Sequence, residues 1–171
     1  MKNRFLSCLV FILISSSIWG QSESAQIGKV IDQWHLAAAK ADFEAYFSKM
    51  TTESVFIGTD ASENWKLQAF KAFSKPYFDK GKAWNFKAVE RNIYLDSSEE
   101  IAWFDELLDT RMGICRGSGV VRIENGAWKI AHYVLSATIP NDDMQQVIEI
   151  KKTKDSLYLK ELKINANITQ E

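Results

Sequence analysis

The sequence predicts an α+β domain in which three N-terminal helices pack on one face of an antiparallel sheet. Between residues 27 and 76, apolar side chains recur mainly at helical spacing, and from residue 83 onward long runs rich in strand-forming residues follow one another. The chain contains no βαβ alternation, internal repeat or glycine-rich phosphate loop. Helices and strands segregated in this way are typical of α+β domains.

Spacing and capping place the first two helices and an early strand. An apolar stripe that includes Trp34 predicts a helix over residues 27–40. Asp42 can cap a short second helix that carries its apolar side chains as far as Met50. Residues 53–59 are rich in β-branched and aromatic side chains, so we expect a strand there.

A third helix is expected to begin at Asp60. Asp60 and Glu63 have the spacing of a capping box, in which a side-chain acceptor precedes a carboxylate by three residues. Pro76 should break or kink this helix, because proline lacks the amide donor and clashes with the preceding turn. Gly81 is expected to end the segment.

The C-terminal half predicts a meander of four strands. These strands are expected over residues 83–95, 101–110, 111–124 and 127–139. Asn125-Gly126 between the last two is a strong signal for a tight hairpin. The sheet should therefore be built mainly from consecutive antiparallel neighbours.

The N-terminus has the features of a signal peptide, and the domain boundaries follow from it. Two basic residues precede an apolar run over residues 5–14, which is too short to span a bilayer, and Gly20 offers a cleavage site. We therefore expect an exported protein, periplasmic or secreted, with a signal peptide over 1–20. One domain over 21–142 and a lysine-rich tail over 143–171 should follow.

Charge and cysteine content exclude several classes of function. Removal of residues 1–20 takes away two of the 21 basic residues and no acidic one, so the mature net charge is 19 − 22 = −3. This charge excludes a nucleic-acid surface, and no later segment is apolar enough to enter a membrane. Cys115 is then the only thiol and should be buried. His35, expected on the surface, His132 and Cys115 lack metal-ligand spacing, so neither metal nor cofactor is expected.

Several local strings, in their order along the chain, carry a family resemblance. They are Trp34–Ala39, Phe56–Asp60, Lys75–Phe78, Ala102–Glu106, Cys115–Gly119 and Trp128–Tyr133. Together they resemble the SnoaL-like proteins of the NTF2-like superfamily over residues 27 to about 140. The resemblance implies a curved sheet wrapped around a helix, a conical cavity, and often a homodimer packed through the sheets.

The resemblance does not select a function, because the superfamily includes ketosteroid isomerases, polyketide cyclases, dehydratases and proteins without a reaction. In ketosteroid isomerases the general base is an Asp at the end of the first strand, a position that is Gly58 in this sequence. The helix position of their oxyanion-hole tyrosine corresponds to Trp34. Neither residue can replace the original group, so the sequence departs from an isomerase of that kind.

Strand alternation nominates two proton-transfer residues. It places Trp103 and Asp105 on one face of their strand, and Trp128 and His132 on one face of theirs. If both tryptophans line the concave side, Asp105 and His132 accompany them, and a buried carboxylate beside an imidazole can move protons on a carbon acid. The simpler alternative is that Asp105 pairs with Arg116 and holds neighbouring strands together.

Large aromatic side chains and one arginine nominate a ligand-binding surface. The candidates are Trp34, Phe56, Trp65, Trp103, Arg116 and Trp128. Aromatic walls suit a flat or apolar ligand, and guanidinium groups bind carboxylates in a bidentate manner. Core packing is the competing interpretation for each tryptophan. The glycines of Gly117-Ser118-Gly119 are expected to mark a bulge or sharp strand curvature.

Three functional hypotheses follow. The leading one is an exported, dimeric protein that binds a small, partly apolar molecule in its cone. The second is an isomerase, cyclase or dehydratase that uses Asp105 and His132. The third is a non-catalytic interaction module whose cone is filled by its own side chains. The state of the cavity discriminates among them, since a binder needs an open one and an interaction module does not.

Overall fold

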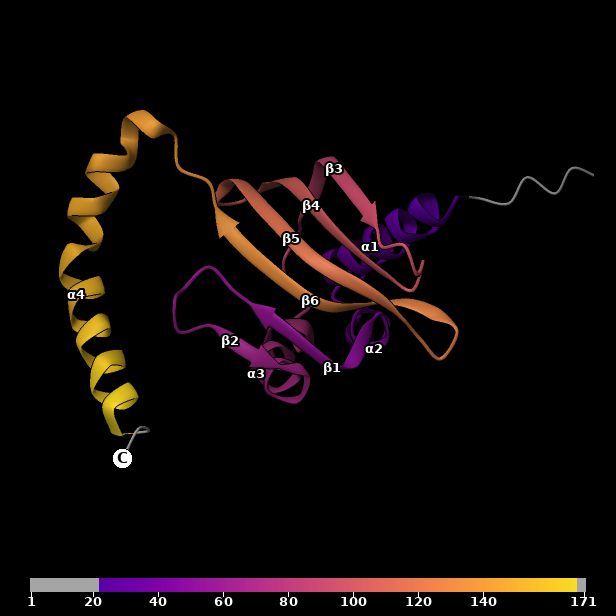
Figure 1. The fold of residues 1–171 in the computed structure, drawn as a ribbon, viewed down its shortest axis with the longest axis horizontal. Helices are drawn as coiled ribbons and strands as arrows, with labels where there is room; N and C mark the ends of the chain where they lie inside the picture. Colours follow the sequence, from indigo (N-terminus) through magenta and orange to yellow (C-terminus); the bar gives the residue numbers. More distant parts are fainter. Residues whose placement is uncertain (1–21, 169–171) are drawn as a thin grey trace, which may run out of the picture.

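The computed structural model describes residues 22–168, so the expected signal peptide over 1–20 lies outside the described residues. The elements are α1 (Glu23–Ala39), α2 (Phe43–Ser48), β1 (Met50–Ile57), β2 (Asn64–Lys66), α3 (Leu67–Asp79), β3 (Lys87–Leu95), β4 (Ile101–Thr110), β5 (Gly113–Glu124), β6 (Ala127–Ala137), η1 (Asn141–Asp143) and α4 (Met144–Ile168). Their order confirms the α+β prediction, with three helices before the long meander (Figure 1).

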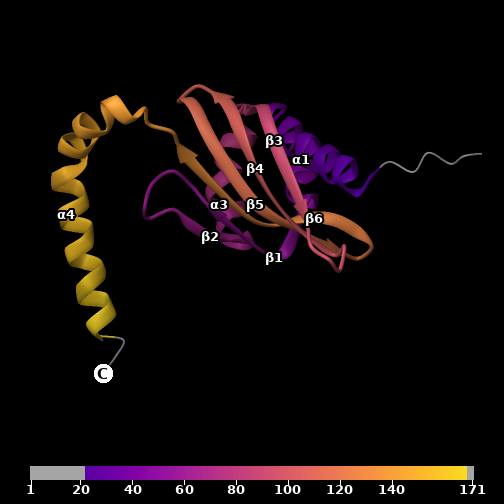
Figure 2. The ribbon, with the colours of Figure 1, turned by 45° about the horizontal axis from the view of Figure 1, so that its top comes forward.

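The six strands form one curved sheet in the order β2-β1-β6-β5-β4-β3. All neighbours are antiparallel except β1 and β6, which run parallel. The sheet is therefore mixed, whereas the sequence predicted an antiparallel one. Turning the view shows α1 and α3 behind the sheet, on a single face of it (Figure 2). This arrangement encloses the core between helices and sheet.

The capping signals hold for α2 but not for the predicted third helix. Asp42 accepts a hydrogen bond from the Ala45 amide at 3.0 Å, as expected of an N-cap. Asp60 instead organises a turn, in which its carboxylate accepts hydrogen bonds from the Ser62 amide and hydroxyl. Residues 64–66 then pair with β1 as β2, and α3 begins only at Leu67. It continues through Pro76 to its last residue, Asp79, without the predicted break.

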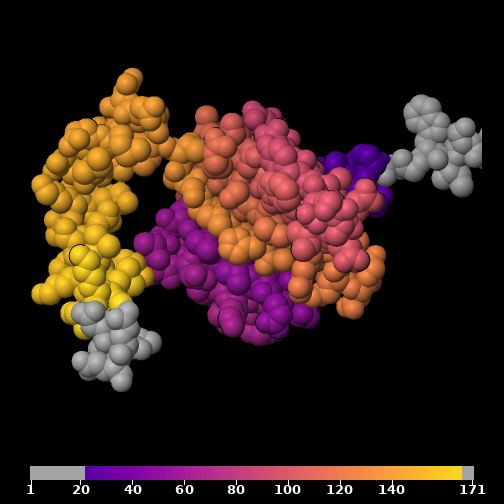
Figure 3. Space-filling model, viewed as in Figure 1, coloured from indigo at the N-terminus to yellow at the C-terminus, as the bar shows by residue number. Residues whose placement is uncertain are grey.

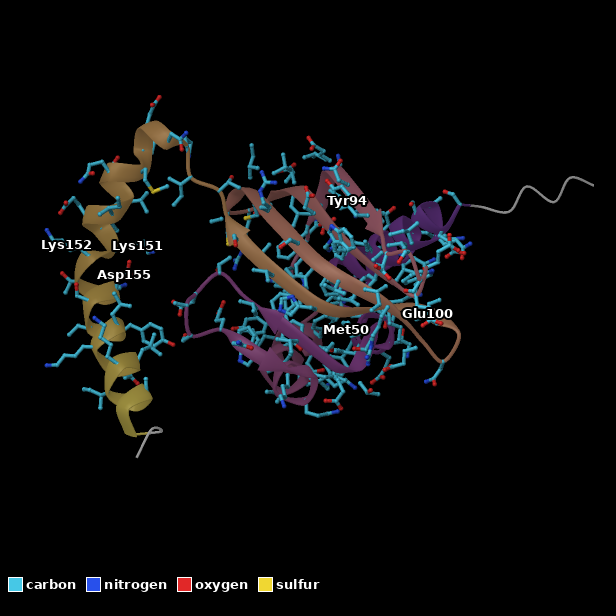
Figure 4. The ribbon with its side chains drawn as sticks, viewed as in Figure 1. Met50, Tyr94, Glu100, Lys151, Lys152 and Asp155 are labelled. Carbon is cyan, nitrogen blue, oxygen red and sulfur yellow. The ribbon has the colours of Figure 1, made fainter. Side chains whose placement is uncertain are left out.

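The inner face of β4 is opposite to the predicted one. Phe104 and Glu106 point into the core and are fully or almost fully buried, whereas Trp103 is 49% exposed and stacks on Tyr94 of β3 at 5.9 Å. Figure 4 labels Tyr94 on this outer face. Alternation itself holds, but it does not determine which of two adjacent aromatic residues faces the helices.

A β-bulge in β6 changes the face of His132. Val121 of β5 pairs with Ile130, but the next residue, Val120, pairs with His132, so Ala131 is the extra residue. A bulge of this kind shifts the alternation by one position. Ile130 is therefore buried before the bulge and Tyr133 after it, and His132 lies on the outer face with Trp103, its neighbour across β5.

Two glycines of β5 make room for large core side chains. A Cβ on Gly117 would lie 2.2 Å from the Tyr133 hydroxyl, and a Cβ on Gly119 would lie 2.8 Å from the Phe104 ring. Close approach thus accounts for both glycines, and the bulge nearby lies in β6. At the hairpin, Asn125 and Gly126 both have positive φ angles, of 55° and 74°, which confirms the predicted tight turn.

The tail is a single helix, α4, that stands beside the domain (Figure 3). It is a 25-residue helix, with an exposed ion pair between Lys151 and Asp155 at 3.2 Å (Figure 4). Leu157, Leu159 and Ile150 are among its exposed apolar side chains. Within residues 22–168, no helix has the length and hydropathy needed to cross a membrane.

Candidate functional site

An open cleft of about 700 Å³ lies at one end of the domain. It is bordered by α3, the irregular segment 80–86 that follows it, and the turn between β4 and β5. A smaller hollow of about 170 Å³ continues it toward β1 and shares Glu63, Phe73, Trp84, Phe86 and Arg111 with it. We call the two together the mouth cleft.

The wall formed by segment 80–86 follows from how α3 ends. The amides of Gly81 and Lys82 donate to the carbonyls of Phe78 and Tyr77, at 2.9 and 3.1 Å, and Gly81 has a φ of 67°. This left-handed glycine cap turns the chain sharply away from the helix axis. The residues after it therefore run along the cleft and present the rings of Trp84 and Phe86 to it.

Aromatic and charged side chains both line the cleft. Phe73 and Tyr77 of α3 face the cleft, and Trp65 stacks on Phe73 at 4.3 Å between ring centroids. The charged residues at the rim are Glu63, Lys82, Lys87, Asp109 and Arg111. Apolar walls with a few polar groups are the usual composition of small-molecule sites.

Arg111 is the basic residue that borders both parts of the cleft, and Glu63 is the acidic one. Arg111 lies in the β4–β5 turn, directly after β4. Among the described residues it has no carboxylate partner within 4 Å, although Asp109 is only two positions away. A guanidinium with free donors beside aromatic walls can bind a carboxylate or another planar anion.

Behind the cleft the interior is filled by stacked rings. Phe56 stacks on Phe70 at 4.1 Å and on Tyr133 at 5.6 Å. Trp34 in turn packs on Tyr133 at 4.8 Å and on Tyr46 at 4.9 Å. The base of the cone is thus closed by the protein's own side chains, and the mouth is open.

A buried charge network lies beside these rings. Glu106 has 0% exposure, and its carboxylate is 2.7 Å from His35 Nε2 and accepts hydrogen bonds from Tyr133 Oη at 2.9 Å and Arg91 Nε at 2.9 Å. Arg91 Nη1 also donates to Asp32 at 2.7 Å. We call Asp32, Arg91, Glu106, His35 and Tyr133 the buried network. It ties α1 to strands β3, β4 and β6.

The network fixes the charge of Glu106 and Tyr133. Burial pushes the pKa of Glu106 upward, but the hydrogen bonds from His35 and Arg91, together with the positive charge of Arg91, bring it below its usual value. Burial raises the pKa of Tyr133 well above its usual value, and the charge of Glu106 adds to this. Glu106 is therefore a carboxylate, and Tyr133 is a neutral phenol that donates to it.

A model of the SnoaL-like domain family matches residues 27–140, two thirds of the chain. The chain belongs to the SnoaL-like domain family. In comparison with curated protein sequences, none matches it.

Solved structures confirm the NTF2-like fold of this SnoaL-like domain. An NTF2-like protein of unknown function from Pseudomonas putida is 17% identical, with 71% of this chain and 92% of that chain covered and a TM-score of 0.58. A proposed dehydratase of the NTF2-like family from Streptomyces avermitilis is 12% identical, with 67% and 95% covered and a TM-score of 0.58. The association domain of C. elegans CaMKII is 20% identical, with 67% and 95% covered and a TM-score of 0.56.

In this SnoaL-like domain, the predicted proton-transfer residues do not meet. Asp105 and His132 lie on the outer face of the sheet with β5 between them, so two strand spacings, about 10 Å, separate their strands. Asp105 accepts a hydrogen bond from Asn92 at 3.2 Å and is 3.8 Å from Arg116. The strand-pairing alternative for Asp105 is therefore the one observed. Arg116, 54% exposed in its side chain, lies away from the mouth cleft.

The predicted aromatic residues divide between cleft, core and surface. Phe56 and Trp65 line the smaller hollow of the mouth cleft. Trp34 is buried in the core, and Trp103 lies on the outer face. Trp128 is at the far end of β6, where its Nε1 donates to Glu23 at 2.7 Å and its ring borders a separate shallow depression.

Sequence reasoning missed the buried network. His35 was expected on the surface, yet it is only 5% exposed and faces the core together with Trp34. Its position four residues after Ile31, a member of the apolar stripe, was the available signal. Cys115 is buried, as predicted. Within residues 22–168, no three His, Cys, Asp or Glu side chains cluster as a metal site would require.

Proposed function

We propose that this SnoaL-like protein is an exported binder of a small molecule with a flat apolar body and an anionic group, held in the mouth cleft. The observation that carries the proposal is Arg111, a guanidinium without an ion pair beside the aromatic walls of an open cleft. Phe73, Trp84 and Phe86 would contact the apolar body of the ligand. Arg111 would hold its anionic group.

The charge of the rim supports an anionic ligand. Lys82, Lys87 and Arg111 contribute three positive charges to the cleft, and Glu63 and Asp109 contribute two negative ones. A carboxylate or sulfonate bound by Arg111 would thus meet a field of slightly positive sign. Hydrogen bonds between charged groups contribute about 1.5–3 kcal/mol each, so one arginine can decide the preference for an anion.

The filled base of the cone does not favour the interaction-module hypothesis. Its rings close only the inner part of the cone, and the mouth cleft of about 700 Å³ is within the usual range of small-molecule sites. An open apolar cavity with a few polar groups at its rim is the arrangement expected of a binder.

A pair of dyes tests this proposal. 8-Anilinonaphthalene-1-sulfonate is flat, apolar and anionic, and N-phenyl-1-naphthylamine has the same rings without the sulfonate. We expect Arg111→Gln to weaken binding of the anionic dye about tenfold, equivalent to about 1.4 kcal/mol, and to leave the neutral dye unchanged. Arg116→Gln, on the outer face, is the matched control and should change neither. Equal weakening of both dyes, or of neither, would contradict the role of Arg111.

Homodimerisation through the outer face of the sheet belongs to the same proposal. Trp103 and Tyr94 stack there, and Ile101, two residues before Trp103 on β4, is exposed on the same face. Contiguous exposed apolar groups mark association surfaces. A neighbour of the same fold is an association domain, which supports this use of the fold. Light scattering should give a dimer mass for the wild type and a monomer mass for Trp103→Lys.

Export rests on the sequence of residues 1–20. Mass spectrometry of the protein recovered from its own host tests it directly, because cleavage after Gly20 gives an N-terminal Gln21. An intact N-terminus on the accumulated protein would contradict export by this route.

A further inference from the structure

We infer that His35 is a proton-transfer residue, whose Nδ1 accepts a proton from a ligand in the mouth cleft while Glu106 holds its Nε2. The inference rests on the proposed function, since it needs a ligand in the cleft. It replaces the Asp105–His132 pair with a different carboxylate and imidazole on the inner face of the sheet.

The two nitrogens of His35 have different environments. Nε2 lies 2.7 Å from the Glu106 carboxylate, whereas Nδ1 is buried and has no hydrogen-bond partner. In the neutral ring, a carboxylate at Nε2 selects the tautomer with its proton on Nε2. Nδ1 then carries an unused lone pair in an apolar environment. A buried acceptor without a partner is rare in proteins and requires an explanation.

The rest of the buried network holds the carboxylate that orients His35. Glu106 accepts from Arg91 Nε and Tyr133 Oη, and Arg91 is held in turn by Asp32. These are the charged and titratable groups that contact the pair from α1, β3, β4 and β6. An imidazole oriented by a carboxylate, which is itself fixed by other groups, is the arrangement of a general base.

Phe86 forms part of the wall between His35 and the cleft. Its ring lies 6.1 Å from the imidazole, edge to face, and the same ring lines both parts of the mouth cleft. It belongs to the irregular segment 80–86, so no helix or sheet pairing fixes the backbone there. His35 itself lines neither part of the cleft, so the inference requires Phe86 to turn aside before a ligand can reach the imidazole.

The proposed step balances within the ligand and His35. A C–H or O–H bond of the ligand breaks, its proton forms the Nδ1–H bond, and the electron pair remains on the ligand. The imidazolium that forms is stabilised by the adjacent Glu106 carboxylate at 2.7 Å. Return of the proton to another atom of the same ligand regenerates the neutral ring.

The test uses 5-nitro-1,2-benzisoxazole, a flat aromatic probe for a positioned base. Removal of its ring C–H proton breaks the N–O bond and releases the yellow 2-cyano-4-nitrophenolate. We expect Phe86→Ala to accelerate the protein-dependent rate at least about tenfold by opening the wall. Adding His35→Gln to Phe86→Ala should lower this rate about a hundredfold or more, which is within the range that a general base contributes. His132→Gln, at the other histidine, is the matched control and should leave it unchanged.

A second measurement does not depend on the folding of a variant. Nitrogen-15 NMR of the wild type, with its histidine rings neutral, should find the His35 proton on Nε2 and a free Nδ1. A proton on Nδ1, or a Phe86→Ala rate that His35→Gln leaves intact, would overturn the inference. The dye titrations separate this failure from that of the proposed function, because they report Arg111 and the cleft without any proton transfer.

Discussion

The charged side chains at the two ends of the cone are arranged differently: those at the base are paired, and, within residues 22–168, Arg111 at the mouth is not. At the base, Glu106 is fully buried and contacts His35, Arg91 and Tyr133. At the mouth, Arg111 borders an open cleft and lacks any carboxylate within 4 Å among the described residues. The charged groups at the base therefore pair with one another, whereas Arg111 at the mouth is available for a ligand. Substitutions at the two ends should accordingly affect different properties.

The largest expected effect is at the base. Arg91→Leu removes a cation from the buried network and leaves the Glu106 carboxylate without its charge partner at 2.9 Å. Breaking a buried pair in this way costs about 3–5 kcal/mol of unfolding free energy, measured by denaturant titration. Arg116→Leu, which removes the exposed 3.8 Å pair with Asp105, is the control and should cost about 0–1 kcal/mol. Similar losses for both variants would contradict the assignment.

An added side-chain atom beside Tyr133 should destabilise the packed base of the cone. In Gly117→Ala, the added methyl would lie 2.2 Å from the Tyr133 hydroxyl, which also has to remain bonded to Glu106. We expect a loss of about 1–3 kcal/mol in thermal or chemical unfolding. Gly28→Ala in α1 is the matched control, because its Cβ would make an ordinary 3.7 Å contact. It should stabilise the protein by up to about 1 kcal/mol.

Titration should reveal the buried titratable groups at both pH extremes. The pKa of Glu106 is lowered on folding, so its contribution is present above the ordinary glutamate pKa of about 4.3 and is lost as pH falls through the lowered value. The pKa values of Tyr46 and Tyr133 are raised, chiefly by burial, so their contribution is complete below about pH 10 and is lost as pH rises further. Tyrosinate absorbance of these two should therefore appear only with unfolding, seen by circular dichroism. Their ionisation in the folded protein would contradict this.

The smallest expected effect is in α4, which lies outside both ends of the cone. Ending the chain after Asp143 removes this helix and its exposed ion pairs. The domain's unfolding free energy should change by no more than about 0.5 kcal/mol, as for surface changes that leave the core intact. A loss of several kcal/mol, or altered dye binding, would show that α4 supports the cleft.

Local signals predicted most of the fold from the sequence. The stripe containing Trp34 predicted α1, Asp42 predicted the start of α2, and Asn125-Gly126 predicted the β5–β6 hairpin. These features depend on neighbours a few residues apart. The parallel pairing of β1 with β6 joins residues 77 to 80 positions apart, and no local pattern encodes it.

The candidate site was harder to predict because it depends on strand faces. One bulged residue, Ala131, moved His132 to the outer face and Tyr133 to the inner face. In β4, the sequence could not decide between Trp103 and Phe104 as the inward ring, and the catalytic nomination fell on Asp105 instead of Glu106. Burial by the helices decides both cases, and burial is a property of the assembled fold.

Native mass spectrometry of the protein purified from its own host tests the central claim most directly. We predict that the wild type retains a small anionic molecule that is released on denaturation, and that Arg111→Gln, purified in parallel, retains much less of it. Arg116→Gln should retain as much as the wild type. An apo mass for all three proteins, or equal retention by Arg111→Gln, would contradict the proposal that the mouth cleft binds its ligand through Arg111.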